Sequence, residues 1–249
     1  MTPTLLKNLA HQPDAVRALG QYRALAVGYD ATCSRIESLR LRAMRELDLK
    51  PGETVFDIAC GTGPLLPQLA TSVGSGGWVV GVEMSPEMAA QARRRVAGIA
   101  FGDRIEVVQY AVESLQTTRR ADALVFCYVH DVLQSPAAID RLIALCKPGA
   151  RIAMVGMKTL PWWWGWPVNV FNLYRARRYL TTYARLDRPW HLLESRGATL
   201  REIDTALFGS AYVTVGRLTS PSAETAPPAS APASSEPLFI PQPTEREST

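Results

Sequence analysis

The stretch Val55-Phe56-Asp57-Ile58-Ala59-Cys60-Gly61-Thr62-Gly63-Pro64 decides the fold of this chain. It reads as an apolar strand that carries a carboxylate near its end and runs into a glycine-bearing turn. Gly61 and Gly63 lack a Cβ and tolerate positive φ, so such a turn lets a ligand lie against bare backbone. Pro64 suits the first position of a helix, where its missing N–H costs nothing. The stretch therefore predicts a strand, a ligand-binding turn and a helix.

A second strand pattern follows, and it ends in another carboxylate. The apolar run Trp78-Val79-Val80-Gly81-Val82 leads into Glu83, twenty residues after Gly63. A carboxylate at the tip of a neighbouring strand can accept both hydroxyls of a ribose, so the two units indicate a nucleoside-type cofactor. A dinucleotide fingerprint needs a third glycine where this chain has Leu66. Asp57, four residues before the first glycine, would repel a phosphate but suits a cationic ligand.

Strand and helix patterns alternate along most of the remaining sequence. We expect a doubly wound, Rossmann-like α/β sheet with helices on both faces and a terminal antiparallel hairpin. The region 157–198 reads as irregular and rich in aromatic residues. The patterns predict helices over 14–48, 64–73, 85–97 and 136–146, and strands over 53–58, 78–82, 105–110, 123–129, 151–156, 200–207 and 211–217.

Length and composition limit the possible classes of protein. The chain has 249 residues, which suits one α/β domain with additions. Residues 219–249 hold seven of the 18 prolines, so we expect them to be a disordered Pro/Ala/Ser-rich tail. This tail carries a net charge of −3, which leaves +7 on residues 1–218 out of the overall +4. The four cysteines show no pairing pattern, and no signal peptide or membrane span is visible, so we expect a cytoplasmic protein.

The motifs resemble those of the class I S-adenosylmethionine-dependent methyltransferases. The resemblance rests on Asp57, Gly61 and Gly63 in the pattern Asp-x-x-x-Gly-x-Gly, on Glu83 after the next strand, and on the turn Lys147-Pro148-Gly149. It covers residues 50–157 with specific motifs and looks closest to the ubiquinone/menaquinone-type small-molecule enzymes. The resemblance implies a seven-stranded sheet and S-adenosylmethionine as cofactor. It also implies a helical cap over 1–49 and a methyltransferase domain over 50–218.

The resemblance further implies a set of cofactor contacts. Asp57 would organise the glycine turn and face the methionine ammonium, and Glu83 would hold the ribose hydroxyls. The family's usual adenine-binding aspartate aligns with Ala111, so the chain departs from the pattern there and leaves the Val112 backbone to bind the ring. The expected contacts are Asp57, Ala59, Gly61, Gly63, Glu83, Met84, Ala111, Val112 and Tyr128.

The end of the fourth predicted strand supplies the candidate catalytic residues. Methyl transfer is a displacement at an activated carbon, so alignment of the acceptor can supply much of the rate. His130 could serve as a base, oriented by Asp131, or it could be a helix-start residue with no chemical role. The segment lacks the Asp/Asn-Pro-Pro-aromatic and Pro-Cys motifs of nucleic-acid methyltransferases. No His/Cys cluster has metal-ligand spacing, so no metal is expected.

The aromatic and basic insert over 158–198 carries the expected substrate specificity. Four of the six tryptophans lie in Trp162-Trp163-Trp164-Gly165-Trp166, and arginines follow them. Three interpretations stay open: a lid over an apolar or aromatic substrate, contact of 162–188 with a membrane surface, and a packed subdomain with a solvated basic face. The candidate substrate contacts are Tyr22, Tyr29, Trp162, Trp166, Arg175 and Tyr183.

The combined patterns favour a methyltransferase of a small or lipid-like apolar or aromatic metabolite. A protein or peptide methyltransferase, and a cofactor-binding pseudoenzyme or regulatory module, are the alternatives. The expected location of the protein is the cytoplasm. Peripheral contact with the inner membrane face through 162–188 is a further expectation.

Overall fold

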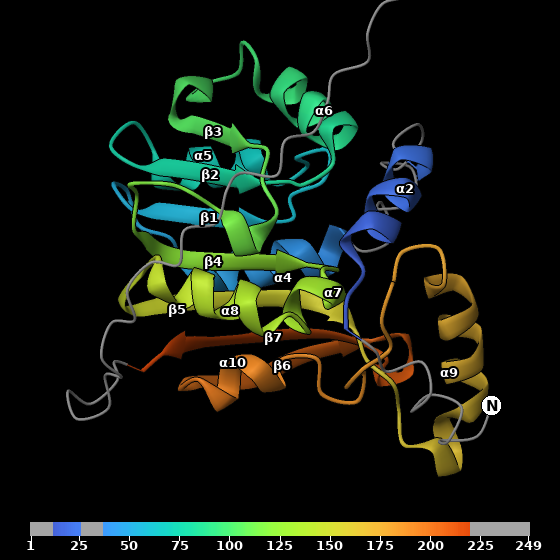
Figure 1. Cartoon of the computed structure of the whole chain (residues 1–249). Helices are drawn as coiled ribbons and strands as arrows, with labels where there is room; N and C mark the ends of the chain where they lie inside the picture. The colour runs from blue at the N-terminus through green and yellow to red at the C-terminus, as the bar shows by residue number, and fades with distance from the viewer. Residues whose placement is uncertain (1–11, 26–36, 220–249) are drawn as a thin grey trace, which may run out of the picture.

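A computed structural model describes residues 12–25 and 37–219 of the chain. Its sheet has seven strands in the order β3-β2-β1-β4-β5-β7-β6 (Figure 1). The first five are parallel, and β7 pairs antiparallel with both β5 and β6. This confirms the predicted doubly wound sheet with a terminal hairpin. The strands are β1 (Thr54–Ile58), β2 (Trp78–Val82), β3 (Ile105–Val108), β4 (Ala121–Cys127), β5 (Cys146–Met157), β6 (Ala198–Ala206) and β7 (Ala211–Leu218).

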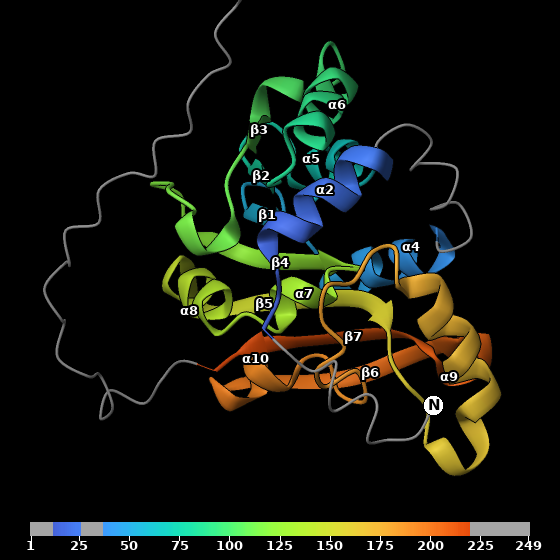
Figure 2. The same ribbon diagram turned by 45° about the vertical axis from the view of Figure 1, so that its right-hand side comes forward.

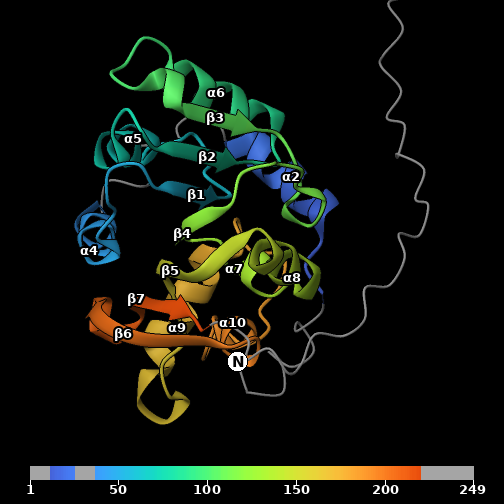
Figure 3. The same ribbon diagram turned by 90° about the vertical axis from the view of Figure 1, so that its left-hand side faces the viewer.

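Helices cover both faces of the sheet because alternate strand residues point to opposite sides. Val55 packs in one buried cluster with α4, α5 and α6, whereas its neighbour Phe56 packs in a second cluster with α8 and α10. Figure 3 shows α4 and α5 on one side of the sheet and α8 on the other. The helices are α2 (Ala15–Leu25), α4 (Glu37–Leu47), α5 (Leu66–Val73), α6 (Pro86–Val96), α7 (His130–Leu133), α8 (Pro136–Ala144), α9 (Trp162–Ala176) and α10 (His191–Ser195).

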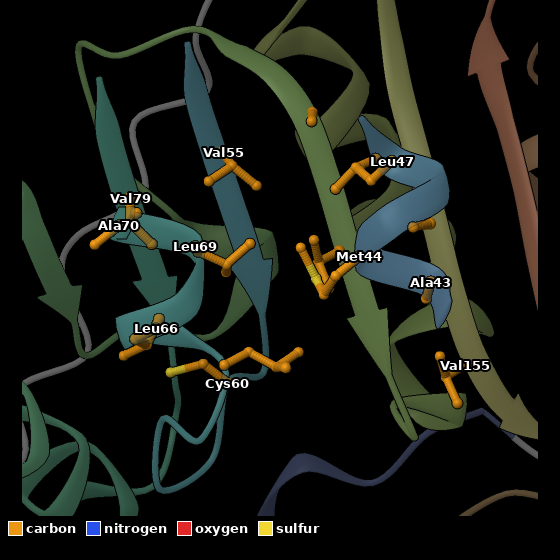
Figure 4. Packing of buried hydrophobic residues seen from close by; sticks show 14 of the residues in the cluster. Ala43, Met44, Leu47, Val55, Cys60, Leu66, Leu69, Ala70, Val79 and Val155 are labelled. Carbon is orange, nitrogen blue, oxygen red and sulfur yellow. The ribbon is translucent and has the colours of Figure 1, made fainter. Parts of the chain in front are cut away.

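The first buried cluster fixes the position of the glycine turn. Leu66 and Leu69 of α5 and Met44 of α4 are buried and point toward β1 and β4, with Cys60 of the turn beside Leu66 (Figure 4). Close packing of this kind leaves little room for movement, so the turn after β1 is held from below by apolar side chains.

Two local expectations around the turns are wrong. Pro64 does not open a helix: it lies in a turn, and α5 begins at Leu66 with Pro67 in its first turn. The Lys147-Pro148-Gly149 turn belongs to β5, which pairs with β4 across an irregular register. By contrast, the predicted start of α6 is confirmed, because the Ser85 hydroxyl accepts a hydrogen bond from Met88 N at 3.3 Å.

The expectation of an irregular insert is also wrong, since Trp162–Ala176 forms the 15-residue helix α9. Pro167 lies inside this helix, although proline lacks the N–H that would bond four residues back. The missing bond would have used the carbonyl of Trp163, a residue that is 86% exposed. Asn169 then anchors the helix to Leu160 with hydrogen bonds of 2.8 Å to its N–H and its carbonyl.

Helices α2 and α9 lie beyond the carboxyl ends of the parallel strands (Figures 1 and 2). The predicted helix over 14–48 appears as α2 and α4, and the residues between them lie outside the described part of the chain, as do the tail from 220 onward and Cys33. Within the described part, no helix combines the length and the apolar content that crossing a membrane requires.

Candidate active site

A cavity of about 180 Å³ lies at the carboxyl edge of the sheet, where the strand order reverses between β1 and β4. This is the position at which doubly wound sheets bind their ligands. The turns after β1 and β2, the segment after β3, the tip of β4 and helix α2 all contribute to its wall. Lining residues include Ala15, Ala18, Tyr22, Ala59, Gly61, Glu83, Met84, Tyr110, Ala111, Val112, Glu113, Tyr128, His130 and Asp131.

The glycine turn exposes its backbone to this first cavity. Ala59 has φ 50° and Gly61 has φ 60°, and both line the cavity. Gly63 does not line it, contrary to the expected floor contact. It has φ 73°, and a Cβ there would lie 2.7 Å from Leu66 Cδ1 and 3.0 Å from Ala92 Cβ. Gly63 therefore allows α5 and α6 to pack closely rather than forming the cavity floor.

Glu83 connects the two turns that form the cavity. Its carboxylate accepts hydrogen bonds from Gly61 N at 2.9 Å and from Ser85 N at 2.7 Å. Burial raises the pKa of Glu83, and these backbone donors oppose the rise. Each carboxylate oxygen can accept a second hydrogen bond, so both could still receive a ribose hydroxyl. The predicted ribose role is therefore compatible with the geometry.

Asp57 is buried within β1 and lines neither this cavity nor the larger one described below. Burial raises the pKa of Asp57 to about 7; the Arg40 guanidinium lowers it and the Glu83 carboxylate raises it further. An Asp57 carboxyl with this pKa is poised between its neutral and charged forms at neutral pH. A cation placed in the adjoining turn would favour the charged form.

The wall of the first cavity also holds residues predicted to contact adenine. Met84, Ala111 and Val112 all line the cavity, so the structure brings these three together. Two lining residues that the sequence patterns did not single out, Tyr110 and Glu113, stand beside them. Glu113 accepts a hydrogen bond of 2.6 Å from the Ser135 hydroxyl. Tyr110 lies in the loop after β3 and Glu113 in the short 3₁₀ turn that follows it.

His130 begins α7 at the tip of β4 and lines the cavity. Burial lowers the pKa of His130 to about 4, and the Ala184 backbone opposes this only in part. Neither ring nitrogen has a hydrogen bond of normal geometry to another described residue. His130 is therefore neutral at physiological pH, and a nitrogen lone pair is available to accept a proton. Tyr128, two residues earlier, has φ 59° and also lines the cavity.

Asp131 does not orient His130, and that prediction is wrong. Its carboxylate accepts hydrogen bonds from Thr181 N at 2.9 Å, from Thr181 Oγ1 at 2.5 Å and from Thr182 N at 3.4 Å. Thr181 Oγ1 in turn accepts from Asp14 N, just before α2, at 2.9 Å. Asp131 and Thr181 thus join three segments: the β4 tip, the loop after α9 and the start of α2. The last two segments contribute Thr181 and Asp14 to the cavity wall, and we call them the cover of the cavity.

A second and larger cavity, of about 660 Å³, adjoins the first. The two share Tyr22, Tyr128, Val129, His130, Tyr179 and Leu180 in their walls. Most of the second wall is apolar, and it comes from α9, the β5 end and the β6–β7 turn. Its lining includes Arg40, Met157, Val168, Phe171, Arg175, Ala176, Leu186, Leu207, Phe208 and Tyr212.

The predicted substrate residues divide between this cavity and other places. Tyr22 and Arg175 line the second cavity. Trp162 and Tyr183 do not; they pack against a small cluster formed by Leu173, Leu180 and Leu186. Trp166 also lies outside both cavity walls and is exposed to solvent. Tyr29 lies outside the described residues.

The charges of the two cavities are opposite. Four carboxyl side chains line the first (Asp14, Glu83, Glu113 and Asp131), and among the described residues no lysine or arginine does. Described residues lining the second include Arg40 and Arg175 and no aspartate or glutamate. An acidic cavity attracts a ligand with sulfonium and ammonium groups and repels a pyrophosphate. The residues present therefore fit S-adenosylmethionine better than a dinucleotide. Among the described residues no group of histidine, cysteine or acidic side chains is arranged to hold a metal ion.

Comparison with known proteins agrees with this assignment. A family model described as a methyltransferase domain matches residues 55–149. Over residues 55–149 this match agrees with the resemblance to class I S-adenosylmethionine-dependent methyltransferases that the motifs predicted.

Individual relatives are similar only at a distance. A demethylmenaquinone methyltransferase of Desulfitobacterium hafniense is 25% identical over 160 residues, or 61% of this chain and 63% of the relative. Nocamycin O-methyltransferase of Saccharothrix syringae is 34% identical over 142 residues, 53% of this chain and 48% of the relative. The crystal structure of a SAM-dependent methyltransferase from Aquifex aeolicus has a TM-score of 0.52 at 18% identity, covering 88% of this chain and all of that one (100%). The chain spans about half the length of the curated relatives it matches.

Proposed function

We propose that this protein transfers the methyl group of S-adenosylmethionine to a small or lipid-like apolar metabolite. The observation that carries the proposal is the meeting of two unlike cavities at Tyr128, Val129 and His130. The acidic cavity suits the cationic cofactor, and the larger apolar cavity suits the acceptor. Residues shared by both walls would then surround the point at which the two ligands meet.

The described residues would act mainly by binding and alignment. S-adenosylmethionine, when bound, supplies a methyl group that is already activated by the sulfonium charge. Glu83 would bind the ribose while holding the glycine turn, and Asp131 would keep the cover closed through its bonds to Thr181. The apolar wall of the second cavity would exclude water and position the acceptor, and such alignment can lower a barrier by about 7–11 kcal/mol.

His130 would accept the proton that an acceptor loses on methylation. Its neutral ring is available at physiological pH because burial lowers the pKa of His130 to about 4. A ring of this pKa is a weak base, so it suits an acceptor that becomes strongly acidic as it gains the methyl group. A hydroxyl oxygen behaves in this way. This role is consistent with the O-methyltransferase and the quinone methyltransferase among the relatives, which act on small molecules by name.

Labelled S-adenosylmethionine and a host-cell extract would test the proposal, with the full chain as enzyme. The extract is then separated into organic-soluble, aqueous and acid-precipitable fractions. Label in the organic fraction supports an apolar acceptor. Label in the precipitate would instead favour a protein or peptide acceptor and overturn the proposal.

A matched pair of variants tests the second cavity itself. Val168→Trp fills space in the wall of the larger cavity, whereas Val170→Trp changes an exposed position of the same helix outside that wall. We expect Val168→Trp to abolish labelling of the organic fraction while S-adenosylhomocysteine binding persists. Val170→Trp should retain both. Equal labelling by the two variants would place the acceptor elsewhere.

A further inference from the structure

The exposed apolar side chains of this protein gather on one surface. We define the aromatic surface as Trp163, Trp164, Trp166, Val170, Phe171 and Tyr174 of α9 with Leu207 and Phe208 of the β6–β7 turn. These eight are most of the large hydrophobic residues that stand exposed in the described part of the chain, the others being Val16, Phe101 and Tyr110. Trp163 and Phe208 are 86% and 82% exposed. Clustered exposure of this kind marks an interaction surface.

The exposure is built into the packing of α9, because its polar side chains point inward. The inward face of α9 carries Gly165, Asn169 and Leu173, four residues apart. Asn169 is buried on its two hydrogen bonds to Leu160, and Asn172 donates to Ser210 Oγ at 2.9 Å. Rotating the helix to bury the tryptophans would break all of these bonds. The aromatic residues therefore face outward because the helix is fixed that way.

Positive charge lies at one end of the aromatic surface. Arg175, Arg177 and Arg178 are exposed, and none of them forms an ion pair within the described residues. The Arg177 guanidinium lies 4.1 Å from the ring centre of Tyr174, and that of Arg175 lies 5.7 Å from the ring centre of Phe171. Helix α9 contains no acidic residue. The surface thus combines aromatic rings with cations and lacks any charge that would repel an anion.

The aromatic surface is continuous with the larger cavity. Phe171, Leu207 and Phe208 are exposed and also line that cavity, so they stand at its mouth together with Arg175. Figure 2 shows α9 at the edge of the molecule beside the β6–β7 hairpin. An apolar molecule that enters between these residues would pass from the aromatic surface into the cavity without crossing water.

We propose that the aromatic surface docks on an anionic lipid bilayer and receives the apolar acceptor from it. This proposal rests on the proposed function in taking the occupant of the cavity to be apolar. Tryptophan and tyrosine rings settle at the headgroup level of a bilayer, and arginines beside them bind anionic headgroups. A surface that binds a nucleic acid strand carries cations along its whole length, because the strand has a phosphate at every nucleotide. The aromatic surface has cations at one end only, so its charge pattern favours the bilayer.

Vesicle flotation of the full chain tests the docking directly, because it does not depend on catalysis. The probes are vesicles of phosphatidylcholine alone and vesicles that also contain phosphatidylglycerol. We expect binding to the anionic vesicles that weakens as salt is added. Arg177→Gln combined with Arg178→Gln should weaken this binding about 25-fold, since each arginine beside an anionic surface contributes about 1 kcal/mol. Trp163→Ser combined with Trp166→Ser should weaken it about tenfold or more, through lost apolar contact.

Val16→Ser is the matched control, because Val16 is an exposed apolar residue on α2 that lines neither cavity. It should bind vesicles like the unmodified chain. Equal binding by all three variants, or no binding to anionic vesicles, would overturn the docking proposal. Self-association that only the tryptophan variant abolishes would assign the surface to a second copy and overturn it too. Vesicle binding without any labelled organic product would instead count against the proposed function and leave the docking in place.

Discussion

The charge state of Asp57 makes cofactor affinity depend on pH. Burial raises the pKa of Asp57 to about 7, so at pH 6 about nine-tenths of the free protein carries the neutral acid and at pH 8 about one-tenth does. The ammonium group of S-adenosylhomocysteine would favour the ionised form. We therefore expect the affinity for S-adenosylhomocysteine to be about tenfold weaker at pH 6 than at pH 8.

Isothermal titration calorimetry in two buffers of different ionisation enthalpy measures both the affinity and the protons released. Binding should release about 0.9 proton per site at pH 6 and about 0.1 at pH 8. His130 does not interfere, because its pKa of about 4 keeps it neutral across this range. In Asp57→Asn the affinity should be weaker, nearly constant with pH and without proton release. Asp103→Asn, at an exposed residue, is the control and should behave like the unmodified chain.

The same carboxyl should make stability fall as pH rises. Its folded pKa of about 7 exceeds the ordinary 3.8, so the folded state holds the proton more tightly between these values. The free energy of unfolding should therefore decrease between about pH 4 and pH 7, by at most about 4 kcal/mol from this group. Asp57→Asn should lose this contribution, while other buried carboxyls such as Glu83 keep theirs. An affinity that does not change with pH in the unmodified chain, or a pH dependence of stability that is identical in Asp57→Asn, would refute the reasoning.

Three further changes test other contacts. Asp131→Asn should lower the free energy of unfolding by about 1–3 kcal/mol and speed proteolysis of the loop after α9, because charged bonds to two threonines are lost; Asp187→Asn, at an exposed residue of that loop, should change neither. His130→Ala should lower turnover about 10²–10⁴-fold and leave S-adenosylhomocysteine affinity within about threefold, as measured by labelling and calorimetry. Gly63→Ala should destabilise more than Gly98→Ala in urea, since both have positive φ but only a Cβ at position 63 meets other atoms within 4 Å.

The cofactor edge of the sheet could be predicted because its signals are local. Residues 55–63 and 78–83 hold the strand, the turn and the terminal carboxylate within a few positions, and parallel strands bring such ends to one edge. Ala59, Gly61, Glu83 and Met84, predicted as cofactor contacts, all line the first cavity. Gly63 does not line that cavity, and a glycine that permits helix packing looks the same in sequence as one that meets a ligand.

The substrate side was harder to predict because its residues are brought together from distant parts of the chain. Asp131 meets Thr181, 50 positions away, and no pattern around Asp131 indicates that partner. The insert was expected to be irregular, yet Trp162–Ala176 forms a helix with Pro167 inside it. Trp162 and Trp166 were expected in the pocket, but Trp162 packs against Leu173, Leu180 and Leu186, and Trp166 is exposed on a helix that Asn169 anchors to Leu160.

The sequence by itself determined the order of strands and helices, the glycine turn and the two strand-end carboxylates, because hydrophobic period and turn chemistry act between near neighbours. Only the tertiary structure decided that an acidic and an apolar cavity meet at His130, that Asp131 binds the loop after α9 rather than the histidine, and that Trp163, Trp164 and Trp166 of α9 are exposed. Each of these depends on contacts between segments far apart in the chain, and such contacts exist only once the sheet has brought those segments together.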